Sequence, residues 1–584
     1  MCIAKEYDLI SELDSFINSF ELLYINEDEY HKYMAISDND FIITNKWILR
    51  LVKKGAKNKK CCYIVPVSTK VEIMSICKDI ISGITEYKIK IEGQKETVIK
   101  IFDSSVLTSQ GCSQLMKYGC IYNESEIKYL NAYLINSTCK VPVENMYSRL
   151  GWLFKDDDIV FLSGKSFSYN IKSEKDSFYS GTLDLSLKGS LEEWVKMVRA
   201  EVIGNIPLTF VLTLGFASII LGFLNHFMDL GCMIFNLVNT SSKGKTTAAM
   251  LAASIWGNPS FDKGLITTLN GTQNAILEFV SHNNSHTVVL DEAATGDKNN
   301  FRKMLYQICS GKERMRLNTE GEMKETHVFN SVIITTAEFF IIDQTAPNGI
   351  RARVFEISDQ FTKSAENSEN IKRIIFKNYG YAGYKFAKYV IEHKDNIITE
   401  YDAVVNFLKQ KVKNKNDLTD RIMSKLAVIV LTNYYMNKCF NFNSSHEDFT
   451  NYILEIEKSV SSESDIAQKA LDCIIQYVQS NLSKFLLKSD GKSCDFIKEE
   501  NTFGAVIQKG KYYEISVLKD LTEKILKDNN FENPREIYRV WQDRKLLVCE
   551  KDRPYKRYKL LKNLPKLSYF VFDIYDDISA NKLL

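Results

Sequence analysis

The clearest chemical signal in the sequence is a polar loop that ends in Gly244, Lys245 and Thr246. An apolar, β-branched run precedes the loop and an Ala-rich helical pattern follows it, so the loop joins a strand to a helix. Backbone N–H groups and the positive end of the helix dipole can then converge on phosphate oxygens. Lys245 can reach the outer phosphates, and the Thr246 hydroxyl can bind Mg²⁺. The expected ATP-binding residues are Asn239, Ser241, Ser242, Lys243, Gly244, Lys245, Thr246 and Thr247.

Asn239 occupies the first position of this loop, where the usual G-x-x-x-x-G-K-[ST] pattern has glycine. After glycine, asparagine is the residue that best tolerates a left-handed backbone conformation. The turn of the loop is therefore expected to survive with asparagine. The alternative interpretation of the whole segment is a G-K-T triplet that occurs by chance in a polar loop.

Two further segments read as strands with polar groups at their ends. Residues 286–290 are apolar and are followed by Asp291 and Glu292. ATP hydrolysis needs one carboxylate to hold the metal ion and another to activate the attacking water, so we assign Asp291 to Mg²⁺ and Glu292 to the general base. Residues 331–337 include Thr336, whose hydroxyl can hold the lytic water. The alternative there is a strand that simply ends in threonine.

Arg351 and Arg353 follow shortly after the second of these strands. The alternation of Ile350, Ala352 and Val354 predicts a strand on which both arginines share the other face. In a ring ATPase, an arginine of one subunit stabilises the transition-state charge in the site of its neighbour. Both arginines are therefore assigned to catalysis, with a solvated strand face as the alternative.

A basic hairpin is predicted between the acidic pair and the Thr336 strand. Lys312, Arg314 and Arg316 fall on one face at period two, and residues 318–321 supply the turn. Such a hairpin can point into a central pore and grip DNA phosphates. Acidic side chains in the same segment can neutralise this charge, so a surface hairpin is the alternative.

The C-terminal region has the pattern of a winged helix. Helices are expected at 516–528 and 533–545, and strands at 546–550 and 555–561 are expected to pair as a basic wing. Basic side chains on the second helix and on the wing suit DNA phosphates. The DNA-binding candidates are Arg539, Arg544, Lys551, Arg553 and Arg557. A protein-binding winged helix is the alternative.

The elements that position these groups divide the chain into four expected domains. Short alternating runs predict a mixed, β-rich domain at 1–195, and the strand–loop–helix pattern places the ATPase core at 196–362. Helical patterns at 363–485 predict a lid and connecting helices, and the winged helix takes 486–584. Eight prolines and 26 glycines are few for 584 residues, which favours long regular elements.

Charge and cysteine content limit the possible classes of protein. The 75 Lys and Arg against 73 Asp and Glu give +2, which excludes a histone-like coat of positive charge but allows local basic patches. The 13 cysteines include no C-x-x-C pair, which indicates reduced thiols in the cytoplasm. The N-terminus lacks the pattern of a signal peptide.

One uncharged stretch, residues 206–224, approaches the length of a membrane span. Its threonine, serine and glycine residues lower the hydrophobicity of the stretch, and no Lys/Arg cluster flanks it. A core helix against a parallel sheet is therefore expected rather than a membrane helix, which remains the alternative.

Taken as an ordered set, these motifs resemble the DUF927 family. That family is grouped with helicase-like AAA+ ATPases related to MCM and superfamily 3 helicases, and it includes replicative helicases of mobile genetic elements such as staphylococcal cassette chromosomes. The likeness covers roughly residues 60–440, and Asn239 departs from the usual glycine of the family. The segments that carry it are 148–154, 239–247, 251–259, 268–271, 291–292, 349–357 and 379–383.

The resemblance implies both a fold and a function. The fold is an α/β AAA+ P-loop ATPase core with a β-rich N-terminal domain, a helical lid and a C-terminal winged helix. The function is ATP- and Mg²⁺-dependent DNA translocation or unwinding by a homo-oligomer, a hexameric ring on single-stranded or forked DNA, in replication. One alternative is an ATP-dependent switch or remodelling ATPase in an anti-phage or partner-recruiting system without processive unwinding. Another is a regulator whose winged helix binds one operator.

Overall fold

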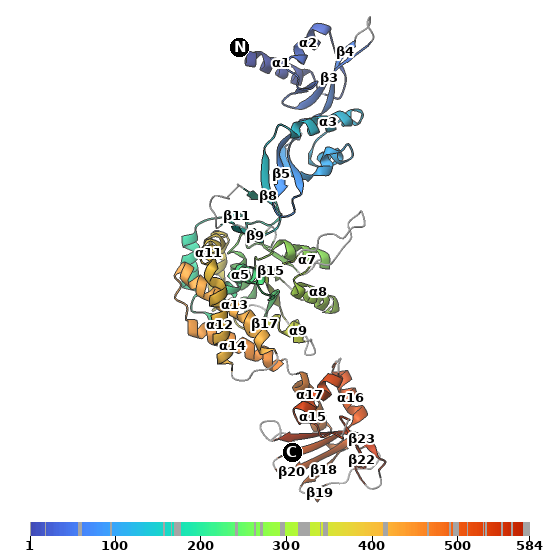
Figure 1. The fold of residues 1–584 in the computed structure, drawn as a ribbon, viewed down its shortest axis with the longest axis vertical. Helices are drawn as coiled ribbons and strands as arrows, with labels where there is room; N and C mark the ends of the chain where they lie inside the picture. The colour runs from blue at the N-terminus through green and yellow to red at the C-terminus, as the bar shows by residue number, and fades with distance from the viewer. Residues whose placement is uncertain are drawn as a thin grey trace.

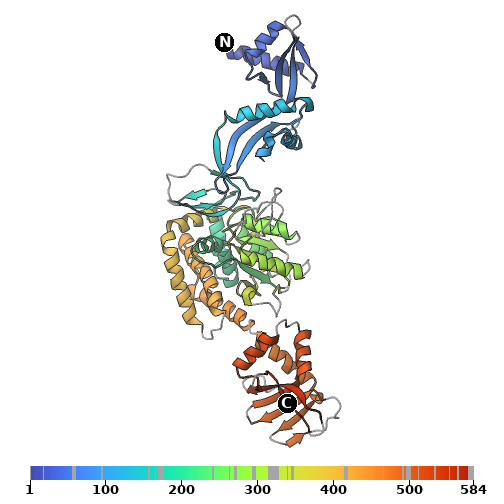
Figure 2. The same cartoon turned by 45° about the vertical axis from the view of Figure 1, so that its right-hand side comes forward.

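The computed structural model is a row of modules along one long axis, with the two termini in opposite end modules (Figure 1). The view in Figure 2, turned by 45°, shows the same order of modules. The structure describes residues 2–575 except for 18, 56–60, 94–95, 156–157, 165, 169–176, 240–242, 262–263, 269–271, 292–297, 313–327, 339, 343–347, 413–417, 464–465, 490–491, 495–501, 511, 530, 532–533, 551–552 and 562–563.

Two sheets form the N-terminal part of the molecule. The first has the strand order β1-β4-β3-β2 and the second has β12-β8-β5-β6-β7. Helix α3 covers one face of the second sheet, where Leu130 and Leu134 share a core with Ile73 and Ile89. The elements of this part are α1 Cys2–Phe16, β1 Leu23–Ile25, α2 Glu27–Met34, β2 Phe41–Ile43, β3 Trp47–Lys54, β4 Cys61–Thr69, β5 Val71–Asp79, β6 Thr85–Glu92, β7 Thr97–Asp103, α3 Ile127–Thr138, β8 Val143–Tyr147 and β12 Ser177–Tyr179.

A small sheet of three strands docks this part onto the central domain. It consists of β9 (Gly151–Lys155), β10 (Asp158–Leu162) and β11 (Ser166–Ser168). Trp152 donates its indole N–H to the carbonyl oxygen of Ile219 at 2.8 Å. Gly151 has a φ of 108°, and a Cβ there would lie 2.6 Å from the Asn284 amide nitrogen. The Gly-Trp pair is therefore required for close docking.

His286 is buried where this small sheet meets the central domain. Its Nε2 lies 2.9 Å from the Ser163 hydroxyl, and its ring stacks on Phe161 with the ring centroids 5.1 Å apart. Burial lowers the pKa of His286 to about 4, because the charged form would lose its hydration. The imidazole is therefore neutral at physiological pH.

This burial makes the stability of the protein depend on pH. Between pH 6.5 and about 4 the unfolded chain binds a proton that the folded chain does not, so the free energy of unfolding falls as the pH falls. The expected loss is about 2 kcal/mol at pH 5 relative to pH 7.5. Urea unfolding at both pH values should show a smaller difference for His286→Gln. An unchanged difference would contradict the assignment; His31→Gln, at an exposed histidine, is the matched control.

The central domain contains a parallel sheet in the order β14-β15-β16-β13-β17. Its strands are apolar and buried, as expected for a parallel sheet covered on both faces. Helices α5 and α6 pack on one face, and α7 and α8 pack on the other. The elements are α5 Ile206–Asn225, β13 Met233–Val238, α6 Lys245–Ala253, β14 Ile266–Thr268, α7 Gln273–His282, β15 Val288–Asp291, α8 Lys298–Ser310, β16 Val332–Ala337, α9 Asn348–Arg351 and β17 Val354–Ile357.

Helix α5 is buried along nearly its whole length. Its N-cap is Asn205, whose side chain accepts a hydrogen bond from the Leu208 amide, and proline follows in the first turn. Among the described helices it alone is long and apolar enough to cross a membrane, and 89% of its apolar window is buried inside the fold. The expected core helix is therefore observed.

The helices that follow β17 form a helical region, in which α11 to α14 pack against α5 and α10 packs against α6. Helix α13 runs along α5 and places Ile422, Leu426 and Ile429 in the same hydrophobic core as Phe210 and Phe216. The helices of this group, with the two short ones that precede α5, are α4 Leu191–Met197, the π-helix η5 Val198–Val202, α10 Ala365–Ile375, α11 Tyr381–Glu392, α12 Ile397–Lys411, α13 Thr419–Phe440 and α14 His446–Glu463.

The C-terminal domain has a sheet in the order β19-β18-β20-β21-β23-β22 with three helices packed on it. Trp541 is buried at the centre of its core and donates its indole N–H to the Ala467 carbonyl at 2.8 Å. The elements are α15 Ile466–Ser480, β18 Phe485–Ser489, β19 Lys492–Cys494, β20 Gly504–Lys509, β21 Tyr512–Leu518, α16 Lys519–Asp528, α17 Pro534–Asp543, β22 Lys556–Tyr558 and β23 Leu567–Tyr575.

The predicted pairing of the C-terminal wing is wrong. Glu550 and Arg553 do form a tight antiparallel bridge, but the segments on either side of it do not pair with each other. Strand β22 pairs with β23, and the Val548 amide also donates to the Val571 carbonyl of β23 at 2.8 Å. Strand β23 offers both segments a long pairing partner, and most of its apolar side chains are buried in the core of the domain.

Candidate active site

The polar groups predicted to act on ATP meet at one edge of the central sheet. Strand β16 lies between β13 and β15, and all three run parallel, so their carboxyl ends are neighbours. Strand β13 leads into the predicted phosphate loop, whereas β15 ends in Asp291 and β16 contains Thr336. In open parallel sheets, ligands bind at this edge. Of the predicted residues, Ser241, Ser242 and Glu292 lie outside the described part of the chain.

Gly244 takes a conformation that other residues rarely adopt. It caps α6 with a φ of 85°, and a Cβ there would lie 2.4 Å from the Thr362 hydroxyl oxygen and 2.8 Å from the Thr362 amide nitrogen. The neighbouring Lys243 carbonyl accepts a hydrogen bond from the Phe361 amide at 2.9 Å. The loop is thus held against the segment that follows β17. The sequence motif predicts the glycine but not this partner.

Asn239 serves the loop through its side chain. It does not have the left-handed backbone that the sequence suggests, because its φ is not positive. Its side-chain amide donates to the Asp359 carbonyl at 2.9 Å, and its own carbonyl accepts from the Lys245 ammonium. Glycine could not make the first of these bonds. Asparagine therefore ties the start of the loop to the segment after β17.

The two threonines at the start of α6 differ in their surroundings. Thr247 is buried, and its hydroxyl lies 2.6 Å from the Ser368 hydroxyl of α10. Thr246 keeps partial exposure. Thr247 therefore anchors α6 to the helical region, whereas Thr246 remains accessible for the predicted metal.

Asp291 and Thr336 are joined across neighbouring strands. The Thr336 hydroxyl donates to the Asp291 carboxylate, and both side chains are buried. The residues two positions earlier, Val289 and Ile334, belong to the core on the α6 side, and side chains alternate along a strand. Both polar groups therefore lie on the sheet face that carries the phosphate loop. Thr336 orients the carboxylate, a contact that the sequence did not predict.

A second polar network on the opposite sheet face was not foreseen. Asn236 accepts from the Thr335 hydroxyl at 2.8 Å and donates to the Glu356 carboxylate at 2.6 Å. The other Glu356 oxygen accepts from the amides of Ile341 and Ile342 at 2.8 and 2.9 Å. The network fixes the segment that follows the Thr336 strand. Its signal in the sequence is a polar residue at the same register of three adjacent apolar strands.

The strand predicted for both arginines is wrong. Helix α9 (Asn348–Arg351) ends at the first arginine, and β17 begins only at Val354. Arg351 is 3% exposed, whereas Arg353 is partly exposed and donates to the Gly349 carbonyl at 3.3 Å. Because β17 is parallel to β13, these residues lie at the amino edge of the sheet, opposite the phosphate loop.

Lys425 of helix α13 brings a second cation close to Arg353. It is buried, and its ammonium donates to the Leu230 carbonyl in the segment before β13. Burial, reinforced by the charge of Arg353, lowers the pKa of Lys425 to about 8. The positive charge at this edge of the sheet therefore comes from both the sheet and the helical region.

The DNA-binding candidates are divided between two places. Lys312 forms an antiparallel bridge with Val328, as the two ends of a hairpin would, and Arg314 and Arg316 lie outside the described residues. In α17 the apolar side faces the core, and Arg539 on its other side is exposed.

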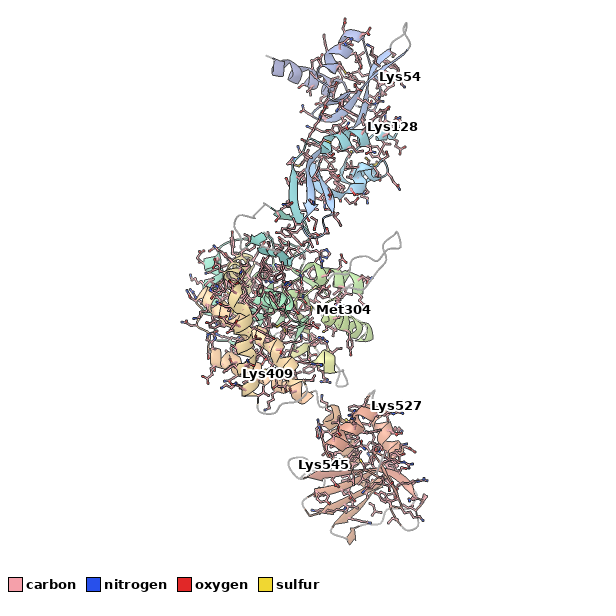
Figure 3. The ribbon with its side chains drawn as sticks, in the orientation of Figure 1. Lys54, Lys128, Met304, Lys409, Lys527 and Lys545 are labelled. Carbon is pink, nitrogen blue, oxygen red and sulfur yellow. The ribbon has the colours of Figure 1, made fainter. Side chains whose placement is uncertain are left out.

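The remaining C-terminal candidates add to this charge. Arg544, Arg553 and Arg557 are exposed, and Lys551 lies outside the described residues. Figure 3 shows Lys527 and Lys545 in the same domain. Of these basic side chains, Arg544 and Lys545 follow directly after α17.

Two family models and a solved structure match this chain. Residues 41–328 match the family model "Domain of unknown function (DUF927)", and residues 465–577 match that of the "Cch helix turn helix domain". A solved structure described as "SCCmec type IV Cch - active helicase" matches with a TM-score of 0.73 and 24% identity, over 92% of this chain and 98% of that chain. No curated protein matches the chain.

The fold and these matches define a mixed α/β protein with a C-terminal helix-turn-helix domain. The matched solved structure shares this overall fold. Residues 41–328 of the chain thus form a DUF927 domain, the family that its sequence motifs resemble.

Proposed function

We propose that the protein is an ATP-dependent DNA helicase or translocase of a mobile genetic element, with an AAA+ core, that acts in the cytoplasm in replication. One observation carries this proposal: the phosphate loop, Asp291 and Thr336 converge at the carboxyl edge of a sheet ordered β14-β15-β16-β13-β17. This order sets the polar end of β16 between the loop that would hold phosphates and the carboxylate that would hold the metal.

The chain has suitable groups for MgATP at this edge. Lys245 would neutralise the outer phosphates, and the oxygen atoms of Thr246 and Asp291 are donors of the kind that Mg²⁺ prefers. The metal would stabilise negative charge on the transferred phosphoryl group. Glu292, next to Asp291, would take the proton of the attacking water.

The placement of the arginines supports assembly into a ring. Arg353 lies at the sheet edge opposite the phosphate loop of its own chain, so it would serve the nucleotide of a neighbouring subunit. A closed ring, for which we propose six subunits, would give every site one such arginine.

The DNA partner is supported by the C-terminal domain and by the structural match. The match to a helix-turn-helix family and the exposed Arg539 of α17 suit a duplex groove. The matched solved structure is described as an active helicase. Lys312 at the base of the predicted hairpin would contribute to a pore, together with Arg314 and Arg316.

A strand-displacement assay tests the proposal against an ATP-dependent switch. The full chain is expected to release a labelled strand from forked DNA only with ATP and Mg²⁺, and single-stranded DNA is expected to raise its ATPase rate several-fold. The rate of strand release should fall steeply with salt, because DNA phosphates are contacted by basic side chains. If the ATPase rate did not change with DNA and no strand were released, the helicase proposal would be wrong and the ATP-dependent switch would be favoured.

A further inference from the structure

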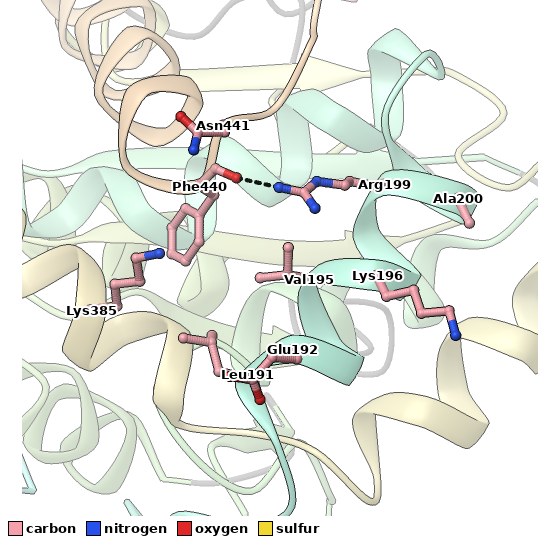
Figure 4. A pocket seen from close by; sticks show the side chains of 9 residues that line it. All are labelled: Leu191, Glu192, Val195, Lys196, Arg199, Ala200, Lys385, Phe440 and Asn441. Carbon is pink, nitrogen blue, oxygen red and sulfur yellow. Dashed lines mark hydrogen bonds between the residues drawn. The ribbon is translucent and has the colours of Figure 1, made fainter.

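A cavity separate from the phosphate loop lies on the helical side of the central domain. Its volume is 490 Å³, within the range of about 300–1,000 Å³ that small-molecule sites occupy. Helix α4, the π-helix η5, helix α11 and the end of α13 surround it (Figure 4). The residues that line it are Leu191, Glu192, Val195, Lys196, Arg199, Ala200, Lys385, Phe440 and Asn441.

The lining carries excess positive charge. Lys196, Arg199 and Lys385 line the cavity together with one carboxylate, Glu192. The Ser190 hydroxyl donates to that carboxylate at 2.5 Å, and this hydrogen bond, with a smaller contribution from the charge of Lys385, lowers the pKa of Glu192. The ionised carboxylate offsets one of the three cations, so an excess of positive charge remains for an anion from solution.

The Arg199 side chain is held in place at the mouth of the cavity. One of its terminal nitrogens donates to the Phe440 carbonyl at 2.9 Å, as Figure 4 shows. Lys385 lies 5.2 Å from the centroid of the Phe440 ring. A guanidinium fixed through one nitrogen can still present its other N–H groups to a phosphate.

The cavity also has an apolar part. Leu191 and Val195 lie one turn apart on α4 and are partly exposed, and the buried Phe440 ring lies behind them at the end of α13. Arg199 and Ala200 belong to the π-helix, a widened turn that is rare and frequently found at functional sites. Cations at the rim and apolar groups below them suit a ligand with a phosphate group and a ring.

We propose that this cavity binds a nucleotide unit, through its phosphate at Lys196, Arg199 and Lys385 and its ring against Leu191 and Val195. The unit is either a free mononucleotide or the 5′-phosphorylated end of a single strand. Both present the same chemistry to the cavity.

The π-helix also connects the cavity to helix α6. Glu201, on the same π-helix as Arg199, accepts from the Asn367 amide of α10 at 2.7 Å. The next residue of α10, Ser368, lies 2.6 Å from the Thr247 hydroxyl of α6. A ligand that restrains the π-helix would therefore restrain the start of α6, an effect that rests on the proposed function of the phosphate loop.

Titration calorimetry of the full chain with AMP tests the site. Lys245→Ala disables the phosphate loop, and AMP is expected to bind this variant with one-to-one stoichiometry. In the Lys245→Ala background, Lys196→Gln with Lys385→Gln is expected to weaken AMP binding at least tenfold. Lys388→Gln, which removes an exposed charge of α11 outside the cavity, should leave it unchanged. Equal melting temperatures would show that the variants fold.

A second arm separates the two sources of the ligand. A short oligothymidylate with a 5′-phosphate and the same strand without it are titrated into the Lys245→Ala chain. An affinity gain from the phosphate that the Lys196 and Lys385 changes abolish identifies the strand end, and AMP binding without such a gain identifies the free nucleotide. Absence of both, or AMP affinity unaffected by the cavity changes, would overturn the proposal. ATP hydrolysis by Lys196→Gln with Lys385→Gln in a chain that keeps Lys245 would test the phosphate loop separately.

Discussion

Replacing Lys245 with alanine is expected to lower the rate of ATP hydrolysis by roughly 10²–10³-fold, because one preorganised cation at the transferred phosphoryl group is lost. In the structure Lys245 begins α6, and its ammonium is held by the Asn239 carbonyl at the other end of the loop. The side chain therefore crosses the space in which phosphates would lie. Phosphate release with saturating DNA measures the effect.

Lys363→Ala is the matched control for this loss. It removes an exposed positive charge from the segment after β17 that holds the loop, and its structural contact, to the Asn367 side chain, is made by the backbone amide, which alanine retains. The ATPase rate of this variant is expected to stay within about twofold of the unchanged protein, since exposed single charges contribute little. If Lys245→Ala kept most of its activity, or if both lysines proved equally important, the assigned role of the loop would be wrong.

Arg353→Ala is expected to lower ATP hydrolysis by about 10³-fold if each arginine completes the site of a neighbour. Its position at the amino edge of the sheet, away from the phosphate loop of its own chain, is the physical reason. A mixture of Arg353→Ala with Lys245→Ala should regain part of the activity. Sites with an intact lysine from one variant then receive an intact arginine from the other.

The mixing experiment also distinguishes catalysis from folding. Arg373→Ala changes an exposed arginine of α10 and should leave the rate unchanged in either preparation. Mixtures that never exceed the activity of the separate variants, although both assemble, would show that Arg353 acts within its own chain or only supports the structure.

The parts of the site that could be predicted from the sequence are those that follow strand ends. The loop before Lys245, the position of Asp291 and the position of Thr336 are local patterns, and parallel strands bring them to one edge wherever such a sheet forms. The helices α16 and α17 were predictable for the same reason, since their apolar spacing is local.

The parts that could not be predicted depend on contacts between distant segments. Gly244 against Thr362 and Thr247 against Ser368 join residues far apart in the sequence, and neither pair carries a local signal. The alternation of apolar residues did not predict the short helix α9, because four residues are too few to establish a helical period. The predicted pairing of the two wing segments was wrong because segments that are close in sequence are not always partners. Here β23 supplies more buried apolar surface and pairs with β22 instead.

The burial of helix α5 has a consequence for how the molecule folds and moves. Its two sides are covered by different segments: the sheet and α6 on one side, and α11, α13 and α14 on the other. Sheet and helical region therefore form one cooperative folding unit, and a chain truncated after β17 would expose one side of this largely apolar helix and aggregate. The same constraint limits motion during a nucleotide cycle. The helical region cannot lift away from α5 without exposing the apolar surface that the two share.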